Sequence, residues 1–309
     1  MAAINRPPAS ASVSPESRSA PLPEPLMLRP CALVTGASSG IGRAFAQRLA
    51  RDGFHLILVA RRQERLAELA REIETLGATA EIVVADLTIP DGLAEVEKRA
   101  AAGDLTALVN NAGFQAYRLF VELDPDVAEA QLYLHTTVPV RLCRAALPAM
   151  LARGDGAIVN VSSMLAFSAG MDQPYLPKRA TYAGTKAFVS AFTETLAGEL
   201  VGTGVKVQAL CPAVVRTEFH DVDGKPVLRP NVPIMEPEDV VEASLAGLAL
   251  GDVICSPALE DRSLIDRERE ARHADLRAHG RSGQARWRRG QGRGACRPGA
   301  AARGSDRRR

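Results

Sequence analysis

The hydrophobic pattern between residues 31 and 260 alternates between short apolar runs and longer amphipathic segments. Val, Ile, Leu and Ala dominate seven short runs, which cover residues 31–36, 54–60, 80–85, 106–110, 156–162, 205–211 and 252–256. Strands buried on both faces have continuous apolar runs of this kind, whereas strands with one face in solvent alternate between apolar and polar residues. The pattern therefore predicts about seven strands of a parallel sheet.

The segments between these runs have apolar residues three and four positions apart, as an amphipathic helix does. An example is RQERLAELAREIETL at residues 62–76, where charged residues fill the other positions. Strand–helix–strand repetition predicts right-handed crossovers and helices on both faces of the sheet. The predicted fold class is therefore α/β, a doubly wound parallel sheet in a single domain over residues 31–266.

Both ends of the chain depart from this pattern. Residues 1–30 hold seven prolines and several serines, without the basic and apolar segments of a secretory signal. Residues 267–309 hold 14 Arg, no Lys and four acidic residues, with Leu276 and Trp287 as the only large apolar side chains. Neither segment can bury enough apolar surface to offset its chain entropy, so we expect both to be disordered.

Charge and composition narrow the possible functions. The net charge is +2, but the 266 residues before the tail carry 24 basic and 32 acidic groups, so the predicted domain is acidic. The basic tail is interpreted as solvated, and binding of an anionic partner or translation out of frame remain alternative hypotheses. With 13 aromatic residues in the chain, we do not expect a nucleic-acid partner.

Two further classes of protein are disfavoured. No apolar run approaches the ~18 residues of a membrane-spanning helix, which excludes an integral membrane protein and predicts no membrane partner. The five cysteines lack CxxC spacing, so no metal site is predicted. Unpaired cysteines of this kind fit a reducing, cytoplasmic location.

A glycine-rich turn follows the first predicted strand. The turn is TGASSGIG at residues 35–42, and an amphipathic helix begins directly after it. Glycines permit a tight turn and let backbone N–H groups approach a pyrophosphate, while the helix N-terminus adds partial positive charge. The sequence therefore predicts a dinucleotide site, with cofactor-binding candidates Gly36, Ser38, Ser39, Gly40, Ile41 and Gly42.

The end of the second predicted strand indicates which dinucleotide binds. An acid about 20 residues past the glycines binds a ribose 2′-hydroxyl, whereas Arg accommodates a 2′-phosphate. Here Ala60 stands at the acid position and Arg61 follows it. Because a guanidinium can hold a phosphate with two charge-assisted bonds, Arg61 predicts a preference for NADP(H) over NAD(H). The alternative is that Arg61 and Arg62 only begin the next helix as solvated charges.

TGASSGIG resembles the TGxxxGxG motif of the classical short-chain dehydrogenase/reductase family. Three further motifs follow in the family's order: NNAG at 110–113, YAGTK at 182–186 and PAVVRT at 212–217. The resemblance covers roughly residues 31–260. It implies a Rossmann-like fold and hydride transfer between a nicotinamide and a small-molecule carbonyl or secondary alcohol.

The resemblance also implies cofactor contacts beyond the glycine loop. They are Asp86 and Leu87 after the third strand, Asn111, Ala112 and Gly113 after the fourth, Tyr182 and Lys186 in YAGTK, and Pro212 and Thr217 after the sixth. Asp86 would contact the adenine, Lys186 the nicotinamide ribose, and the 212–217 segment the nicotinamide amide. Ala213 replaces the family's glycine in that segment. A helix N-cap remains the alternative role for Asp86, and simple turn chemistry the alternative for the Asn pair.

Tyr182 and Lys186 are the expected catalytic pair. A spacing of four places both on one face of a helix predicted over 180–201. A phenol has a pKa near 10, and we expect the ammonium together with an oxidised nicotinamide to lower it. Tyr182 would then give a proton to a carbonyl oxygen or take one from an alcohol. The resemblance implies a catalytic serine after the fifth strand, and Ser163 fits this position better than Ser162.

His135 stands where the family has a catalytic Asn. The family uses the backbone carbonyl of that residue to hold a water beside the lysine. Because any residue supplies a carbonyl, His135 could preserve this proton relay; it could also titrate and tune the pH profile, or it could have only a packing role. Pro139 is expected to kink the helix and expose this carbonyl.

Two segments are predicted to shape the substrate pocket. The 18 residues between Ser163 and Tyr182 exceed the family's usual number by about six, so 164–179 is expected to bulge at the pocket mouth. Tyr175 within it is rejected as the acid, since Arg179 and not a lysine follows at the fourth position. Residues 218–236 are expected to form a mobile lid over a fairly apolar pocket. The resemblance implies a homodimer or homotetramer. A cofactor-binding regulator without turnover is the alternative function.

Overall fold

The computed structural model describes residues 29–174, 176–220 and 233–282. Within them, seven parallel strands form one sheet in the order β3-β2-β1-β4-β5-β6-β7. The strands are β1 (Cys31–Thr35), β2 (His55–Ala60), β3 (Thr79–Val84), β4 (Leu105–Asn110), β5 (Gly156–Val161), β6 (Val205–Leu210) and β7 (Ile254–Cys255). The predicted seven-stranded parallel sheet is confirmed, and only β7 is clearly shorter than its apolar run.

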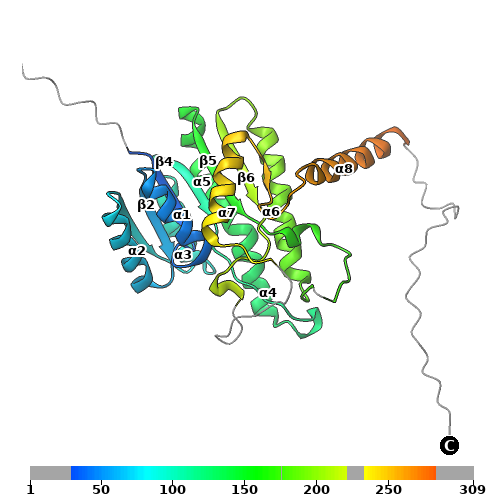
Figure 1. Ribbon diagram of the computed structural model, residues 1–309, viewed down its shortest axis with the longest axis horizontal. Coiled ribbons are helices and arrows are strands. Elements are labelled where there is room, and N and C mark those ends of the chain that lie inside the picture. The colour runs from blue at the N-terminus through cyan, green and yellow to red at the C-terminus, as the bar shows by residue number, and fades with distance from the viewer. Residues whose placement is uncertain (1–28, 175, 221–232, 283–309) are drawn as a thin grey trace, which may run out of the picture. The chain divides into compact units, whose positions relative to one another are not determined.

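Helices cover both faces of the sheet (Figure 1). The long ones are α1 (Gly40–Arg51), α2 (Gln63–Thr75), α3 (Pro90–Ala100), α4 (Pro125–Leu132), α5 (Val138–Arg153), α6 (Ala180–Glu199) and α7 (Pro237–Leu250). One hydrophobic core joins the sheet to α1, α2 and α7, and includes Phe45, Leu69 and Val240. A second core on the opposite face includes Leu93 of α3 and Leu142 of α5. This two-sided burial explains why the strands have continuous apolar runs.

The topology leaves a crevice above the centre of the sheet. Strand β1 pairs with β2 on one side and with β4 on the other, so the chain order reverses at β1. The segments that follow β1 and β4 therefore leave the sheet in different directions. Open α/β sheets bind ligands at this switch point, beyond the carboxyl ends of the strands.

Between α4 and α5 the chain forms a π-helix, η2 (Tyr133–Thr137). Pro139 lies at the start of α5 and has no N–H, so the carbonyl of His135 cannot accept the usual helical bond from residue 139. π-Helical turns inside longer helices are frequent at functional sites. The sequence predicts that Pro139 kinks the helix near His135, and the structure shows a wider, π-helical turn at this place.

The chain divides into two units after Ala258, and the second is described by itself. It contains α8 (Ser263–Ser282), which overlaps the start of the segment that the sequence predicts to be disordered, residues 267–309. Ion pairs between Arg269 and Asp266 (3.0 Å) and between Arg272 and Glu268 (2.8 Å) link successive turns of α8. Pairs at this spacing stabilise a helix.

Some predictions fall outside the described residues. These are the leader over residues 1–28, the tail over 283–309 and the central part of the expected lid, 221–232. Across the part of the chain that is described, no helix combines the length and the apolar character that a bilayer span requires.

Candidate active site

The glycine-rich turn lies at the switch point and depends on three of its glycines. Gly36 and Gly40 have φ values of +67° and +55°, which favour glycine. A Cβ on Gly42 would overlap the Asn111 amide and the Gly36 carbonyl, so Gly42 permits the helix to approach the loop. The turn thus presents its backbone at the N-terminus of α1, where a pyrophosphate would be stabilised.

The NNAG segment braces this turn. The Thr35 hydroxyl accepts hydrogen bonds from the backbone N–H groups of Asn111 (2.9 Å) and Ala112 (3.0 Å), and donates one to the Val109 carbonyl (3.3 Å). The Asn111 side-chain amide donates to the Thr35 carbonyl at 2.9 Å. Residues after β4 therefore fix the shape of the loop after β1.

Arg62, which the sequence analysis treated as an alternative helix charge, contacts the glycine-rich turn. Its guanidinium donates to the hydroxyls of Ser38 (2.9 and 3.2 Å) and Ser39 (2.8 Å). Glu218 accepts from Arg62 at 2.9 Å and from Arg65 at 2.5 Å, and these two arginines hold the pKa of Glu218 below its usual value. The cofactor end of the crevice is therefore positively charged.

Arg61 is the more exposed of the two arginines after β2. Its side chain is 71% exposed and lies 3.7 Å from the Asp86 carboxylate. Burial opposes the ionisation of Asp86, but hydrogen bonds from Thr88 and the charge of Arg61 outweigh it and lower the pKa of Asp86. Arg61 and Asp86 thus stand as a charged pair at the mouth of the crevice.

Tyr182, Lys186 and Ser163 come together where α6 passes the end of β5. The Lys186 ammonium lies 5.7 Å from the centre of the Tyr182 ring and donates to the Val161 carbonyl at 2.8 Å. Ser163 lies close enough to Tyr182 to lower the pKa of its phenol. Ser162 instead donates to the Lys186 carbonyl at 2.8 Å and is paired with Ser190 in the interior. The geometry thus directs Ser163, rather than Ser162, toward the phenol.

The ring of Tyr182 is enclosed by three other rings. The ring centroids of Tyr117, His135 and Phe219 lie 5.4, 5.7 and 6.0 Å from it. Tyr182 is 4% exposed as a result. Edge-on contacts of this kind fix the ring's orientation as well as burying it.

Burial changes the pKa values of Tyr182 and Lys186. It raises the pKa of the Tyr182 phenol well above its ordinary value; Tyr117 raises that pKa further and Ser163 lowers it. Burial lowers the pKa of Lys186 to about 8. The expected lowering of the Tyr182 pKa is therefore wrong for the chain alone. That expectation depended in part on the positive charge of an oxidised nicotinamide, and the residues of the chain do not supply this charge.

The His135 side chain joins two parts of the site. Its Nε2 accepts from the Phe114 backbone N–H at 3.2 Å, so the proton lies on Nδ1, which donates to the Thr185 hydroxyl at 3.1 Å. Thr185 in turn donates to the Tyr182 carbonyl at 2.8 Å. Burial, then the charge of Lys186, lowers the pKa of His135 well below its usual value. His135 stays neutral near pH 7, contrary to the idea that it titrates there.

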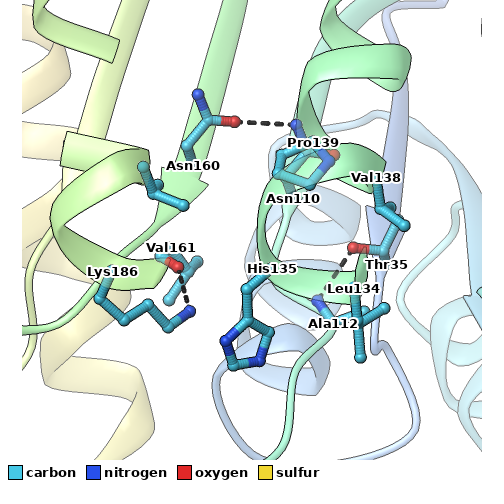
Figure 2. Close-up of a pocket in the computed structure, with 11 residues that line it drawn as sticks. Thr35, Asn110, Ala112, Leu134, His135, Val138, Pro139, Asn160, Val161 and Lys186 are labelled. Carbon is cyan, nitrogen blue, oxygen red and sulfur yellow. Dashed lines mark hydrogen bonds between the residues drawn. The ribbon is translucent and has the colours of Figure 1, made fainter. Parts of the chain in front are cut away.

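A small cavity of about 10 Å³ lies between His135 and Lys186. Figure 2 shows the two side chains reaching it from different helices, η2 and α6. The Asn110 Oδ1 atom, from another lining residue, is buried and has no hydrogen-bond partner among the described residues. This is close to the smallest space that holds one water molecule.

A larger cavity of about 690 Å³ follows the crevice. All of the predicted site residues except Gly42 and His135 line this cavity. The lining residues among them are Gly36, Ser38, Ser39, Gly40, Ile41, Arg61, Asp86, Leu87, Asn111, Ala112, Gly113, Ser163, Tyr182, Lys186, Pro212 and Thr217. The rest of its lining is mainly apolar and includes Phe114, Met164, Leu165, Phe167, Met171, Leu176 and Phe219, together with Tyr117 and Ser168. The cavity therefore has a polar, charged end and an apolar end.

Three residues of the site were missed from the sequence. Arg62 had a signal, because it directly follows Arg61 at the end of an apolar strand. Tyr117 and Phe219 are single aromatic residues in irregular segments, and no spacing or motif marks them. Only the fold brings them to Tyr182.

Residues 30–225 match the short chain dehydrogenase family, and the chain belongs to that family. It is an NAD(P)-dependent oxidoreductase that acts on hydroxyl or carbonyl groups. A short-chain dehydrogenase from Sphingobium yanoikuyae, solved with NADPH, is similar at 37% identity and a TM-score of 0.77, over 84% of this chain and 100% of that one.

Two further relatives act on different compounds. The bulky-bulky ketone specific alcohol dehydrogenase of Comamonas testosteroni is 33% identical with a TM-score of 0.73, over 84% of this chain and 98% of that one. The 17-beta-hydroxysteroid dehydrogenase type 3 of Danio rerio is 31% identical over 240 residues, 75% of each chain. The family is therefore shared, while the named compounds differ.

Proposed function

We propose that this protein transfers a hydride between NADP(H) and the carbon of a ketone or secondary alcohol, with Tyr182, Ser163 and Lys186 as catalytic residues. The observation that carries the proposal is their convergence at the junction of the polar and apolar ends of one cavity. A cofactor in the polar end and a ketone in the apolar end would both reach Tyr182.

The residues present fit a dinucleotide. The backbone cradle of Gly36 to Gly42 leaves no room for a side chain at any of its three glycines, as a close-packed pyrophosphate loop requires. Asp86 and Leu87 would border the adenosine end; Asn111, Ala112, Gly113, Pro212 and Thr217 would line the rest of the path to Lys186. When bound, the nicotinamide supplies or accepts the hydride.

The charge after β2 supports NADP(H) as the preferred cofactor. Arg61 and Arg62 both line the cavity, and Ala60 places no carboxylate against a 2′-phosphate. Arg62 already holds the Ser38 and Ser39 hydroxyls, whose own protons are available to an anion. The arginine pair, rather than Arg61 alone, is therefore the proposed 2′-phosphate site.

In reduction, Tyr182 gives its proton to the carbonyl oxygen. Its raised pKa keeps the phenol protonated at neutral pH, which is the form that this step needs. Ser163 donates a hydrogen bond to the same oxygen and stabilises its developing negative charge. Lys186, charged below a pKa of about 8, stabilises the phenolate that remains.

The proton that Tyr182 loses must be replaced from solvent. A water in the small cavity would reach Lys186, the His135 carbonyl and the unsatisfied Asn110 oxygen. Pro139 supports this role because it cannot donate to the His135 carbonyl. His135 thus contributes its backbone to the relay, while its neutral imidazole holds the loop after β4.

The apolar end of the cavity supports a bulky, uncharged ketone as the substrate class. The charged residues among its described lining residues are Arg61, Arg62, Asp86, Glu218 and Lys186. All but Lys186 lie at the cofactor end, so a charged substrate group would lack a partner. Relatives that act on bulky ketones and hydroxysteroids agree with this class.

We also propose the assembly and location. Exposed apolar side chains on α4 (Val127, Leu132) and α6 (Phe188) support a homodimer or homotetramer through these helices. Cys31, Cys143 and Cys211 are buried free thiols, which supports a reducing, cytoplasmic location.

The proposal is tested by mixing purified protein with NADPH or NADH and a panel of ketones that range from acetone to diaryl ketones. We expect ketone-dependent oxidation of NADPH, faster for the bulky apolar members and slower with NADH. Tight NADPH binding without consumption of any panel member would contradict the proposal and favour a regulator.

A further inference from the structure

The bulge between Ser163 and α6 forms one wall of the apolar end of the cavity. Phe167, Met171 and Leu176 line the cavity from this segment. Its regular structure is limited to a short helical turn, η3 (Met164–Phe167), and neither hydrophobic core includes these three side chains. The wall must therefore be held by something other than core packing or a strand ladder.

A single guanidinium supplies that support. Arg179, which directly precedes α6, donates to the Ser168 hydroxyl (2.8 Å) and carbonyl (2.9 Å). It also donates to the carbonyls of Met171 (2.9 Å) and Pro177 (3.1 Å). Four bonds from one side chain thus join both ends and the middle of the segment.

The contacts of Arg179 indicate that it holds the backbone of the segment in place and does not neutralise an acidic side chain. All partners of Arg179 are backbone carbonyls or a hydroxyl, and within the described residues it forms no ion pair. Arg offers five donors in a rigid plane, whereas Lys offers three on a flexible stem. Arg179 bonds to four acceptor atoms, one more than the three donors of a lysine could satisfy.

The support also begins close to the catalytic phenol. Arg179 is the residue before Ala180, and Tyr182 follows in the first turn of α6. The wall is thereby fixed relative to the helix that carries the phenol. A shift of the wall would change the space beside Tyr182 without disturbing either core.

We propose that Arg179 is the positioning residue that determines substrate size selectivity, because it fixes the wall formed by Phe167, Met171 and Leu176. The inference rests on the proposed function and deepens it. Arg179 does not line the cavity, so it acts through Phe167, Met171 and Leu176. A loosened wall would no longer fit closely around a bulky apolar ketone.

The test compares Arg179→Lys and Arg179→Gln with wild type on a diaryl ketone and on acetone. We expect kcat/KM for the diaryl ketone to fall about tenfold or more, mainly through KM, in the range of pocket-fit effects. The acetone value and the NADPH dissociation constant should change less than about threefold, because small substrates contact little of the wall. Arg179→Lys should lose the wild-type preference for the diaryl ketone as Arg179→Gln does, although it keeps the positive charge.

The matched control is Arg153→Lys. Arg153 also donates to backbone carbonyls, those of Gly103, Leu105 and Asp155, but at the amino ends of β4 and β5. Its substitution should lower thermal stability and leave the ratio between the two ketones unchanged. Selectivity that changes equally in both variants would overturn the proposal.

Amide hydrogen exchange provides a second measurement that needs no turnover. The amides of Met171 and Leu176 should exchange faster in Arg179→Lys, while the amides of β5 and α6 keep their protection. Unchanged exchange in this segment, or an unchanged ratio between the two ketones, would refute the role of Arg179. If wild type turns over no ketone, the proposed function fails, and the exchange data alone then decide whether Arg179 holds the wall.

Discussion

At the scale of single residues, the two arginines after β2 differ in how they could contribute to the proposed preference for NADP(H). Arg62 binds both serines of the glycine-rich turn, whereas Arg61 is largely exposed beside Asp86. A guanidinium held by neighbours loses less entropy when it binds an anion. Arg62 should therefore contribute more than Arg61 to the binding of a 2′-phosphate.

We predict that Arg62→Ala raises the KM for NADPH about tenfold or more, and that Arg61→Ala raises it less, since charge-assisted bonds contribute roughly 1.5–3 kcal/mol. The KM for NADH should change little in either variant, because it lacks the 2′-phosphate. Steady-state kinetics with both cofactors measure this. An equal loss of affinity for NADH would show a general defect of the turn instead.

The buried His135 makes a prediction about acid stability. Its pKa is lowered in the folded protein, so the unfolded state binds an extra proton once the pH falls below the ordinary value of about 6.5. Stability is therefore fully present above that pH and is lost as the pH falls below it. In the folded enzyme the imidazole remains neutral and adds no inflection to the activity profile near pH 6.5.

His135→Asn should lower the unfolding free energy by about 1–2 kcal/mol at neutral pH, since it breaks bonds to Phe114 or Thr185. It should also reduce the loss of stability between about pH 6.5 and 5. Urea unfolding across this pH range measures both effects. Disappearance of an activity inflection near pH 6.5 in the variant would contradict the assigned neutral imidazole.

At the scale of elements, the π-helical turn η2 and the start of α5 line the small cavity through which we propose that the proton passes. Pro139 removes the one backbone donor that would occupy the His135 carbonyl in a regular α-helix. The same helix contains a second proline, Pro148, further from the site. Substituting each proline in turn separates an effect on the proposed proton relay from an effect on the stability of α5.

Pro139→Ala should lower kcat several-fold, because the new N–H can compete for the His135 carbonyl. Pro148→Ala should leave kcat unchanged, although both variants alter helix stability. The comparison uses kcat with saturating NADPH and ketone, together with thermal unfolding. Equal kcat values for the two variants would exclude a role of this carbonyl in the rate.

The elements also show what the sequence could predict. Strands buried on both faces and helices with a single apolar face have regular patterns, and the fold follows from them. The motif residues could be placed because each adjoins a strand end. Helix α8 was not predicted from the sequence, and ion pairs link its successive turns. The contacts of Tyr117 and Phe219 with Tyr182 join distant loops, and no local pattern encodes them.

At the scale of the whole molecule, the residues of the site lie in the unit that ends at Ala258. The strands, both cores and the cavity lining all belong to it. Residues 259–309 carry the strongly basic composition but none of the site residues. The basic composition of this second unit therefore does not supply the positive charge of the cavity, which comes from Arg61 and Arg62.

We predict that a chain truncated after Ala258 keeps its kcat/KM for ketone reduction within about twofold and its thermal midpoint within a few degrees, because no core residue is removed. Purified full-length and truncated proteins can be compared directly. A large loss of turnover would show that the second unit takes part in the site.

The most direct test of the account is Tyr182→Phe, which keeps the ring in its aromatic surroundings and removes only the proton donor. We predict that the variant binds NADPH with nearly unchanged affinity and that its ketone reduction falls by roughly 10²–10⁴-fold, the usual contribution of a general acid. Turnover close to that of wild type in this variant would contradict the mechanism.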